Sequence, residues 1–191
     1  MKNTKLIIVG VVVAIIALLG GVYVTSYNSI ISLEEKVNTE YSNIESQLQR
    51  RADLIPNLIN TVKGYMSHEE KIIKDITDAR ERISSASNIS ELSEADQQLS
   101  AALTNLNVIV ENYPDLKANE NFLNLQDELA GTEHRVATAR KDYNDAVKAY
   151  NTKIQTIPSN IIANMMGKQQ REYFEVSDES KKDVPVVDFS E

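Results

Sequence analysis

Five polar and aromatic residues between positions 140 and 151 are the residues best spaced to meet a ligand. They are Arg140, Tyr143, Asn144, Tyr150 and Asn151. The Tyr-Asn pair recurs after seven residues, so on a helix the two pairs lie on one face, two turns apart. Tyrosines at buried positions are usually amphipathic core residues whose hydroxyl groups reach a partner. The spacing favours structural hydrogen bonds, and a ligand-binding or enzymatic site is the alternative.

Other catalytic and metal-binding patterns are missing from the sequence. His68 precedes Glu69 and Glu70, and His134 follows Glu133, but neither has the Glu-x-x-His or His-Glu-x-x-His spacing of metal-binding helices. The chain has no Cys, no Gly-x-Ser-x-Gly turn and no glycine-rich phosphate loop. We therefore expect no catalytic residues, no metal and no cofactor.

The elements that position these residues begin with an apolar stretch from Leu6 to Val24. It contains nineteen residues, thirteen of them Leu, Ile or Val, and no charge, amide or proline. Such a helix spans a hydrocarbon core of roughly 30 Å, and its insertion should be favoured by roughly 4–8 kcal/mol. Residues 1–25 are predicted to form a transmembrane anchor. A cleaved signal peptide is the alternative, with Val24-Thr25-Ser26 as a weak cleavage site.

Charges and small residues around this stretch predict orientation and pairing. Lys2 and Lys5 precede it, whereas Glu34 and Glu35 are the first charged residues after it. The positive-inside rule then favours a cytoplasmic N-terminus and an external domain. Small residues at spacings of 4, 3 and 4 could form a dimer face in the membrane. These residues are Gly10, Ala14, Ala17 and Gly21.

Four amphipathic helices are predicted between residues 26 and 158. Apolar residues recur every three or four positions over 30–48, 55–86, 92–113 and 122–150, the last in a seven-residue register typical of a coiled coil. The first helix could continue the membrane helix. Pro56 is expected to end it, with Asp53 capping the next helix, and Asn88 with Glu91 and Asn119 are expected to cap the later helices.

Helices with single apolar stripes and short links bury those stripes against one another. We therefore predict an all-α fold: an N-terminal transmembrane helix followed by an antiparallel up-and-down four-helix bundle. The alternative is three long helices, the first kinked at Pro56. Residues 159–175 form a short amphipathic segment that closes the bundle end or, alternatively, lies on the bilayer. Residues 176–191 form an acidic tail that is expected to be disordered.

Several long motifs in this sequence resemble the LemA family of bacterial membrane proteins. They include RRADLIPNL at 50–58, YPDLKANENF at 113–122, LQDELAGTEHR at 125–135 and DYNDAVKAYN at 142–151. The resemblance implies an N-terminal membrane helix followed by an antiparallel helical bundle, in the bacterial plasma membrane. It brings no established enzymatic activity or cofactor. Gene neighbourhoods in the family also suggest an accessory role in membrane proteolysis or envelope stress.

Two polar links are predicted to share the end of the bundle that is distal to the membrane. Charges and prolines on loops of a rigid scaffold suit the docking of a protein partner. The alternative is plain loop closure, with Asp53 and Asn119 serving as helix caps. The candidate docking residues are Arg50, Arg51, Asp53, Pro56, Tyr113, Asp115, Lys117 and Asn119. The net charge of −8 argues against nucleic acid as the partner. The predicted function is a single-pass, membrane-anchored scaffold or interaction module at the cell envelope, without catalysis. The small-residue face in the membrane stretch allows it to form a homo-oligomer.

Overall fold

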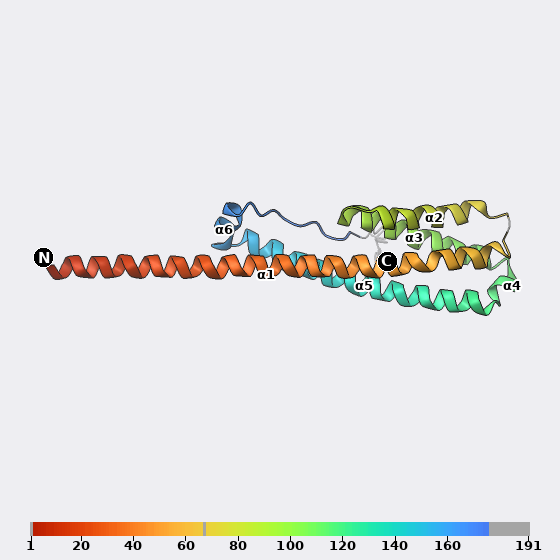
Figure 1. Ribbon diagram of the computed structural model, residues 1–191, viewed down its shortest axis with the longest axis horizontal. Coiled ribbons are helices and arrows are strands. Elements are labelled where there is room, and N and C mark those ends of the chain that lie inside the picture. Colours follow the sequence, from red (N-terminus) through yellow and green to blue (C-terminus); the bar gives the residue numbers. More distant parts are fainter. Residues whose placement is uncertain (1, 67, 176–191) are drawn as a thin grey trace, which may run out of the picture. The chain divides into compact units, whose positions relative to one another are not determined.

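The computed structural model describes residues 2–66 and 68–175, with side chains from residue 6 onward. Six α-helices follow one another along these residues, and none of them lies in a strand (Figure 1). This confirms the all-helical prediction. The helices are α1 Lys2–Lys63, α2 Glu70–Ser85, α3 Ile89–Val110, α4 Pro114–Lys117, α5 Glu120–Gln155 and α6 Ser159–Met165.

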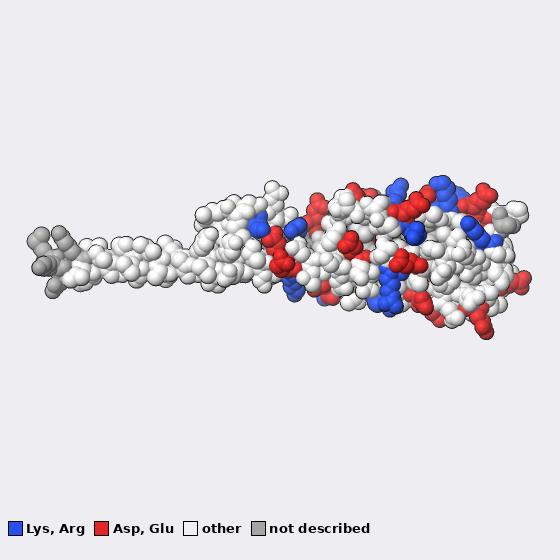
Figure 2. Space-filling view, viewed as in Figure 1, with Lys and Arg blue, Asp and Glu red and all other residues white. Residues whose placement is uncertain are grey.

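The helix α1 is unbroken over 62 residues. Its apolar side chains between Leu6 and Val24 are exposed, for example 71% for Leu6 and 66% for Leu18. Figure 2 shows this stretch as surface without charged side chains. Among the described residues, α1 is the one helix long and apolar enough to cross a membrane. It also continues past residue 26, as one of the sequence predictions allowed.

The predicted helix break at Pro56 is wrong, because Pro56 lies inside α1. Without an N–H group it cannot bond the carbonyl of Ala52, which costs about 3 kcal/mol. Ile55 and Leu58 beside it are at most 1% exposed, and each such buried side chain contributes roughly 1.5–3 kcal/mol. This burial outweighs the lost bond. Asp53 is therefore no helix cap; it lies within α1 and accepts a hydrogen bond from Gln49 at 2.8 Å.

The helix α1 ends instead at Lys63, within the predicted second helix. The N–H groups of Tyr65 and Met66 both donate to the carbonyl of Val62 at 3.0 Å, and α2 begins at Glu70. Residues 55–63 thus belong to α1, and of the predicted second helix only residues 70–85 form α2.

The later helix starts follow the predicted capping residues. The Asn88 side chain accepts a hydrogen bond from the N–H of Glu91 at 2.9 Å, and the Glu91 carboxylate accepts one from the N–H of Ser87 at 2.8 Å. The hydrogen bonds from Ser87 lower the pKa of Glu91. The Asn119 side chain likewise accepts from the N–H of Phe122 at 3.1 Å. Both caps are confirmed.

The described residues divide into two compact units. Unit 1 contains residues 2–44 and 137–173, and unit 2 contains residues 45–66, 68–136 and 174–175. Each unit has a core of apolar residues spaced three or four apart, which is the predicted single buried stripe per helix. In unit 1 the core includes Ile30, Val37, Ile44, Ala139, Ala146, Tyr150 and Ile162. In unit 2 it includes Leu48, Ile55, Leu58, Ile76, Ile83, Leu99, Leu106 and Phe122. The predicted acidic tail, 176–191, lies outside the described residues.

Candidate functional site

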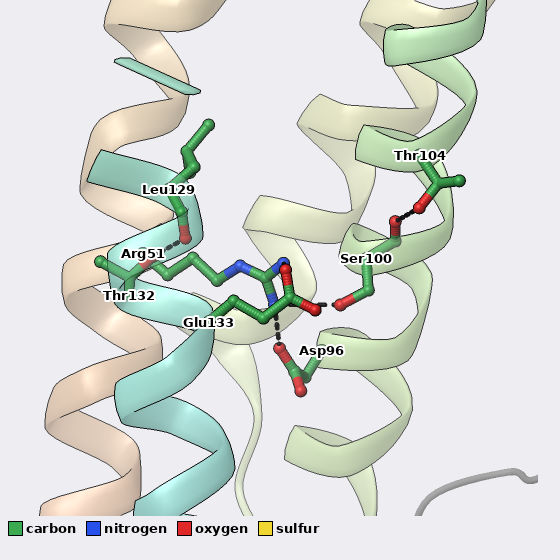
Figure 3. Close-up of polar contacts among 7 residues, drawn as sticks. All are labelled: Arg51, Asp96, Ser100, Thr104, Leu129, Thr132 and Glu133. Carbon is green, nitrogen blue, oxygen red and sulfur yellow. Dashed lines mark hydrogen bonds and ion pairs between the residues drawn. The ribbon is translucent and has the colours of Figure 1, made fainter. Parts of the chain in front are cut away.

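A buried arginine connects three helices of unit 2. Arg51 on α1 is 2% exposed, and its Nη1 atom lies 2.8 Å from Oδ1 of Asp96 on α3 (Figure 3). The same Nη1 donates to the hydroxyl of Ser100 at 3.0 Å. Nη2 lies 3.6 Å from Oε2 of Glu133 on α5. Asp96 is 1% exposed, whereas Glu133 is 62% exposed, so only the Arg51–Asp96 pair is fully removed from water.

The position of Arg51 changes the interpretation of the predicted docking set. A buried charge needs a close partner, because removing it from water costs several kcal/mol. Asp96 supplies that partner, so the guanidinium group holds the helices together and is not available to another protein. Arg50, Asp53 and Pro56 are exposed on α1 and are not part of a loop.

The predicted residues after position 112 lie in the link between α3 and α5, and this link contacts the residues that follow α1. The Tyr113 hydroxyl donates to Oε1 of Glu69 at 3.3 Å, and the Asn119 amide donates to the Tyr65 hydroxyl at 3.0 Å. Asp115 and Lys117 are exposed on the short helix α4 within this link. We call residues 64–66, 68–69 and 111–119 the loop pair. Two links therefore share one end of unit 2, but the first follows α1 and does not contain the predicted residues at positions 50–56.

Two members of the Tyr-Asn cluster contact the chain's own C-terminal segment, residues 168–172, in unit 1. The carboxamide of Asn151 donates to the carbonyl of Arg171 and accepts from its N–H, both at 2.9 Å. The Tyr143 hydroxyl donates to the carbonyl of Glu172 at 2.9 Å. These atoms thus hold an extended piece of backbone, which supports the structural interpretation over a ligand site.

Burial changes the pKa values of the two tyrosines in the cluster, Tyr143 and Tyr150. Tyr143 is 3% exposed, and its ring meets that of Tyr41 edge-on at 6.3 Å. Burial raises the pKa of Tyr143 to about 12, and burial also raises the pKa of Tyr150. Neither hydroxyl ionises near neutral pH, so neither is poised as a general base. Arg140 and Asn144 are half-buried on the same helix.

Ion pairs that the sequence reading missed also hold residues 168–172. Lys168 lies 2.5 Å from Glu34 on α1, and the Arg171 guanidinium lies 3.5 Å from the same carboxylate. Arg171 also donates to the side chain of Asn38 at 3.4 Å. The partners are about 135 positions apart, and no local pattern marks such pairs.

The remaining predicted positions are on the membrane stretch and at the histidines. A side chain added at Gly10 or Gly21 meets nothing within 4 Å, so this face is open. His68 and His134 are exposed. Among the described residues no group of three or more His, Cys, Asp or Glu is close enough to hold a metal ion.

Comparison with known proteins places this arrangement in a family. A model described as the LemA family matches residues 40–189. Magnetosome protein MamQ 2 of Paramagnetospirillum magneticum is 28% identical over 187 residues, covering 84% of this chain and 68% of that protein. Protein LemA of Metamycoplasma hominis is 26% identical over 165 residues, covering 85% of this chain and 75% of that protein. Since the family match extends over most of the sequence, this chain belongs to the LemA family.

Proposed function

We propose that the protein is a single-pass, membrane-anchored scaffold that presents a helical domain to a protein partner and performs no catalysis. The observation that carries this proposal is α1, a single helix in which an exposed apolar stretch continues without a break into the helices of the domain. Exposed Leu, Ile and Val side chains over this length are stable in lipid and unfavourable in water. Two relatives, one named a magnetosome protein and one named LemA, match most of this chain.

For the domain, we propose an antiparallel four-helix bundle built from 45–63 of α1, α2, α3 and the first half of α5. Support comes from the single buried stripe on each helix and from Arg51, which contacts residues of α3 and α5. The short links after α1, α2 and α3 suit neighbouring antiparallel helices. For orientation, we propose a cytoplasmic N-terminus and an external domain, because Lys2 and Lys5 precede the apolar stretch. Protease treatment of intact cells tests this orientation: digestion of the domain supports it, and protection contradicts it.

We propose the loop pair as the docking surface for the partner. Tyr65 is 42% exposed there, and Asp115 and Lys117 are exposed beside it. Side-chain hydrogen bonds join the two links of the loop pair, so a partner would meet a preorganised surface at little entropic cost. Exposed aromatic and charged groups on rigid loops are typical of interaction sites.

The test is affinity capture of the full-length chain from detergent-solubilised membranes of its own cells. A D115A/K117A variant should lose a specific partner, because it removes the two exposed charges of α4 at the centre of the loop pair. The matched control is K71A/D75A, which removes one basic and one acidic residue from the exposed face of α2 and should retain the partner. Equal recovery from both variants would contradict docking at the loop pair, and capture of no other protein would contradict the scaffold function.

A further inference from the structure

The end of unit 1 that contains α6 exposes a cluster of large apolar side chains. Ile157 is 82% exposed, Ile161 is 59% exposed and Met165 is 74% exposed. The opposite side of the short helix is buried through Ser159, Ile162 and Ala163, so α6 is already packed within unit 1. Apolar side chains that gather on an exposed face usually mark a surface that something else covers.

The contacts of α6 place this face beside the apolar stretch of α1. The hydroxyl of Ser159, the first residue of α6, lies 3.5 Å from that of Ser26. Ser26 comes two residues after Val24, which is about 3 Å along a helix. The chain after α6 is held by the Lys168–Glu34 ion pair, and Glu34 lies about 12 Å further along α1 than Ser26. The helix α6 is therefore level with the point where the apolar stretch ends.

Two tyrosines mark the same level as a membrane–water boundary. The rings of Tyr23 and Tyr27 stack with their centres 6.1 Å apart, and both are at least 40% exposed. Tyrosine is enriched where a membrane-spanning helix leaves the hydrocarbon region, because its ring is apolar and its hydroxyl is polar.

The distribution of charge also fits lipid as the covering partner. There is no charged residue between Lys5 and Glu34, nor between Lys153 and Lys168. In Figure 2 the apolar part of α1 and the adjoining tip of the lobe that contains α6 show no charged side chain on the face shown, and the first charged side chains appear immediately beyond them. A second copy of the chain is a poorer fit, because three side chains fall far short of the roughly 20 residues that a stable protein interface uses on each side.

We propose that α6 and the preceding turn form an interfacial contact with the lipid bilayer, in which Ile157, Ile161 and Met165 enter the region between headgroups and acyl chains. This inference rests on the proposed transmembrane position of α1. An apolar helix face of this kind enters the boundary by about 5–10 Å. The contact gives unit 1 a second attachment to the membrane beside α1. It thereby restricts the rotation and tilt of unit 1 relative to the membrane.

The test uses the absence of Cys from the sequence, which allows a fluorescent bimane probe at one introduced cysteine. The full-length chain is reconstituted in phosphatidylcholine vesicles, with and without lipids brominated in the upper part of their acyl chains. Probes are placed at M165C and I161C on α6, at I16C in the apolar stretch, and at T39C as the control. Thr39 is exposed and lies about 20 Å beyond Ser26 along α1.

Brominated lipid should quench M165C, I161C and I16C by about twofold and leave T39C unchanged, because quenching requires contact with the acyl-chain region. Quenching of I16C without quenching of the two α6 probes would overturn this inference and leave the membrane anchor intact. Absence of quenching at I16C would overturn both the contact of α6 with lipid and the membrane position of α1. An α6 probe whose emission depends on the protein-to-lipid ratio but not on bromine would show a second copy as the occupant, and would also overturn the inference.

Discussion

At the residue scale, polar groups in this protein mainly hold its own segments together. Arg51 is the largest side chain that is fully buried, and Asn151 binds both backbone groups of Arg171. The sequence indicated both residues as candidate site residues, Arg51 for docking and Asn151 in the Tyr-Asn cluster, but it could not show their partners. Asp96 is 45 residues from Arg51, and Arg171 is 20 residues from Asn151. Pairs of this kind follow from tertiary packing and have no signature in local spacing.

Removing Asp96 should destabilise the protein strongly, because it leaves the Arg51 charge buried without its closest partner. We expect D96A to lower the free energy of unfolding by about 3–5 kcal/mol. The exposed neighbour Glu94 provides the control, and E94A should change the free energy by less than about 0.5 kcal/mol. Urea unfolding of the detergent-solubilised chain, followed by circular dichroism, measures both.

The double variant R51M/D96L tests whether the unpaired charge causes the loss of stability in D96A. Replacing both charges by apolar groups of similar size should recover most of the loss in D96A. A double variant that is as unstable as D96A would contradict the view that the unpaired charge causes the loss.

Tyr143 should make stability depend on pH in the alkaline range. Its pKa is about 12 in the folded protein against 10.0 for an ordinary tyrosine. Because the folded value is the higher one, the contribution is complete below pH 10 and is lost as the pH rises toward 12. Y143F should reduce the slope of the unfolding free energy against pH between pH 10 and pH 12. Y173F, at a tyrosine that is 43% exposed, should leave that slope unchanged. Equal slopes in the wild type and Y143F would contradict the assignment.

At the element scale, the sequence predicted helix starts better than helix ends. Asn88 and Asn119 are caps whose hydrogen bonds are local, so their residue types suffice to place them. Pro56 misled the prediction, because its intrinsic preference is overridden by burial of Ile55 and Leu58 on the same helix. The end of α1 at Lys63 is not marked by a change in the spacing of apolar residues, and Met66 just after it is still buried, at 1% exposed.

The position of Pro56 inside α1 gives a prediction with a definite sign. P56A should stabilise the protein by about 1–3 kcal/mol, because alanine restores the N–H donor and removes the clash of the ring. If the segment were a loop, the same change would destabilise it by about 0.4–1 kcal/mol. N57A at the adjacent exposed position is the control. Thermal unfolding of the three proteins in detergent decides between the outcomes.

At the scale of the whole molecule, the sequence was most informative about the all-helical fold class and the apolar N-terminal stretch. An uncharged stretch of nineteen residues is read directly from composition, and single-face periodicity predicts helices that need one another for burial. The placement of α6 beside Ser26 could not be predicted from the sequence, since it depends on contacts between residues far apart in the chain. One side of α6 is buried in unit 1, as bundle closure predicted, and its exposed side is the one proposed to contact the bilayer.

Pairing of the membrane helices is a separate prediction at this scale. If Gly10, Ala14, Ala17 and Gly21 form a dimer face, G10I should weaken association in vesicles by about tenfold, because a bulky side chain prevents close approach. G20I is the matched control, since Gly20 is equally open but lies off this stripe. Association can be followed by energy transfer between labelled copies. Equal association of the two variants would contradict the predicted face.

The central claim is that α1 keeps its apolar stretch in the membrane in the mature protein. Alkaline carbonate extraction of cell membranes, followed by intact mass determination of the chain in pellet and supernatant, tests it most directly. We expect the chain to retain residues 1–25 and to remain in the pellet. A soluble chain that begins near Thr25 or Ser26 would contradict the account, because the stretch would then be a removed signal sequence.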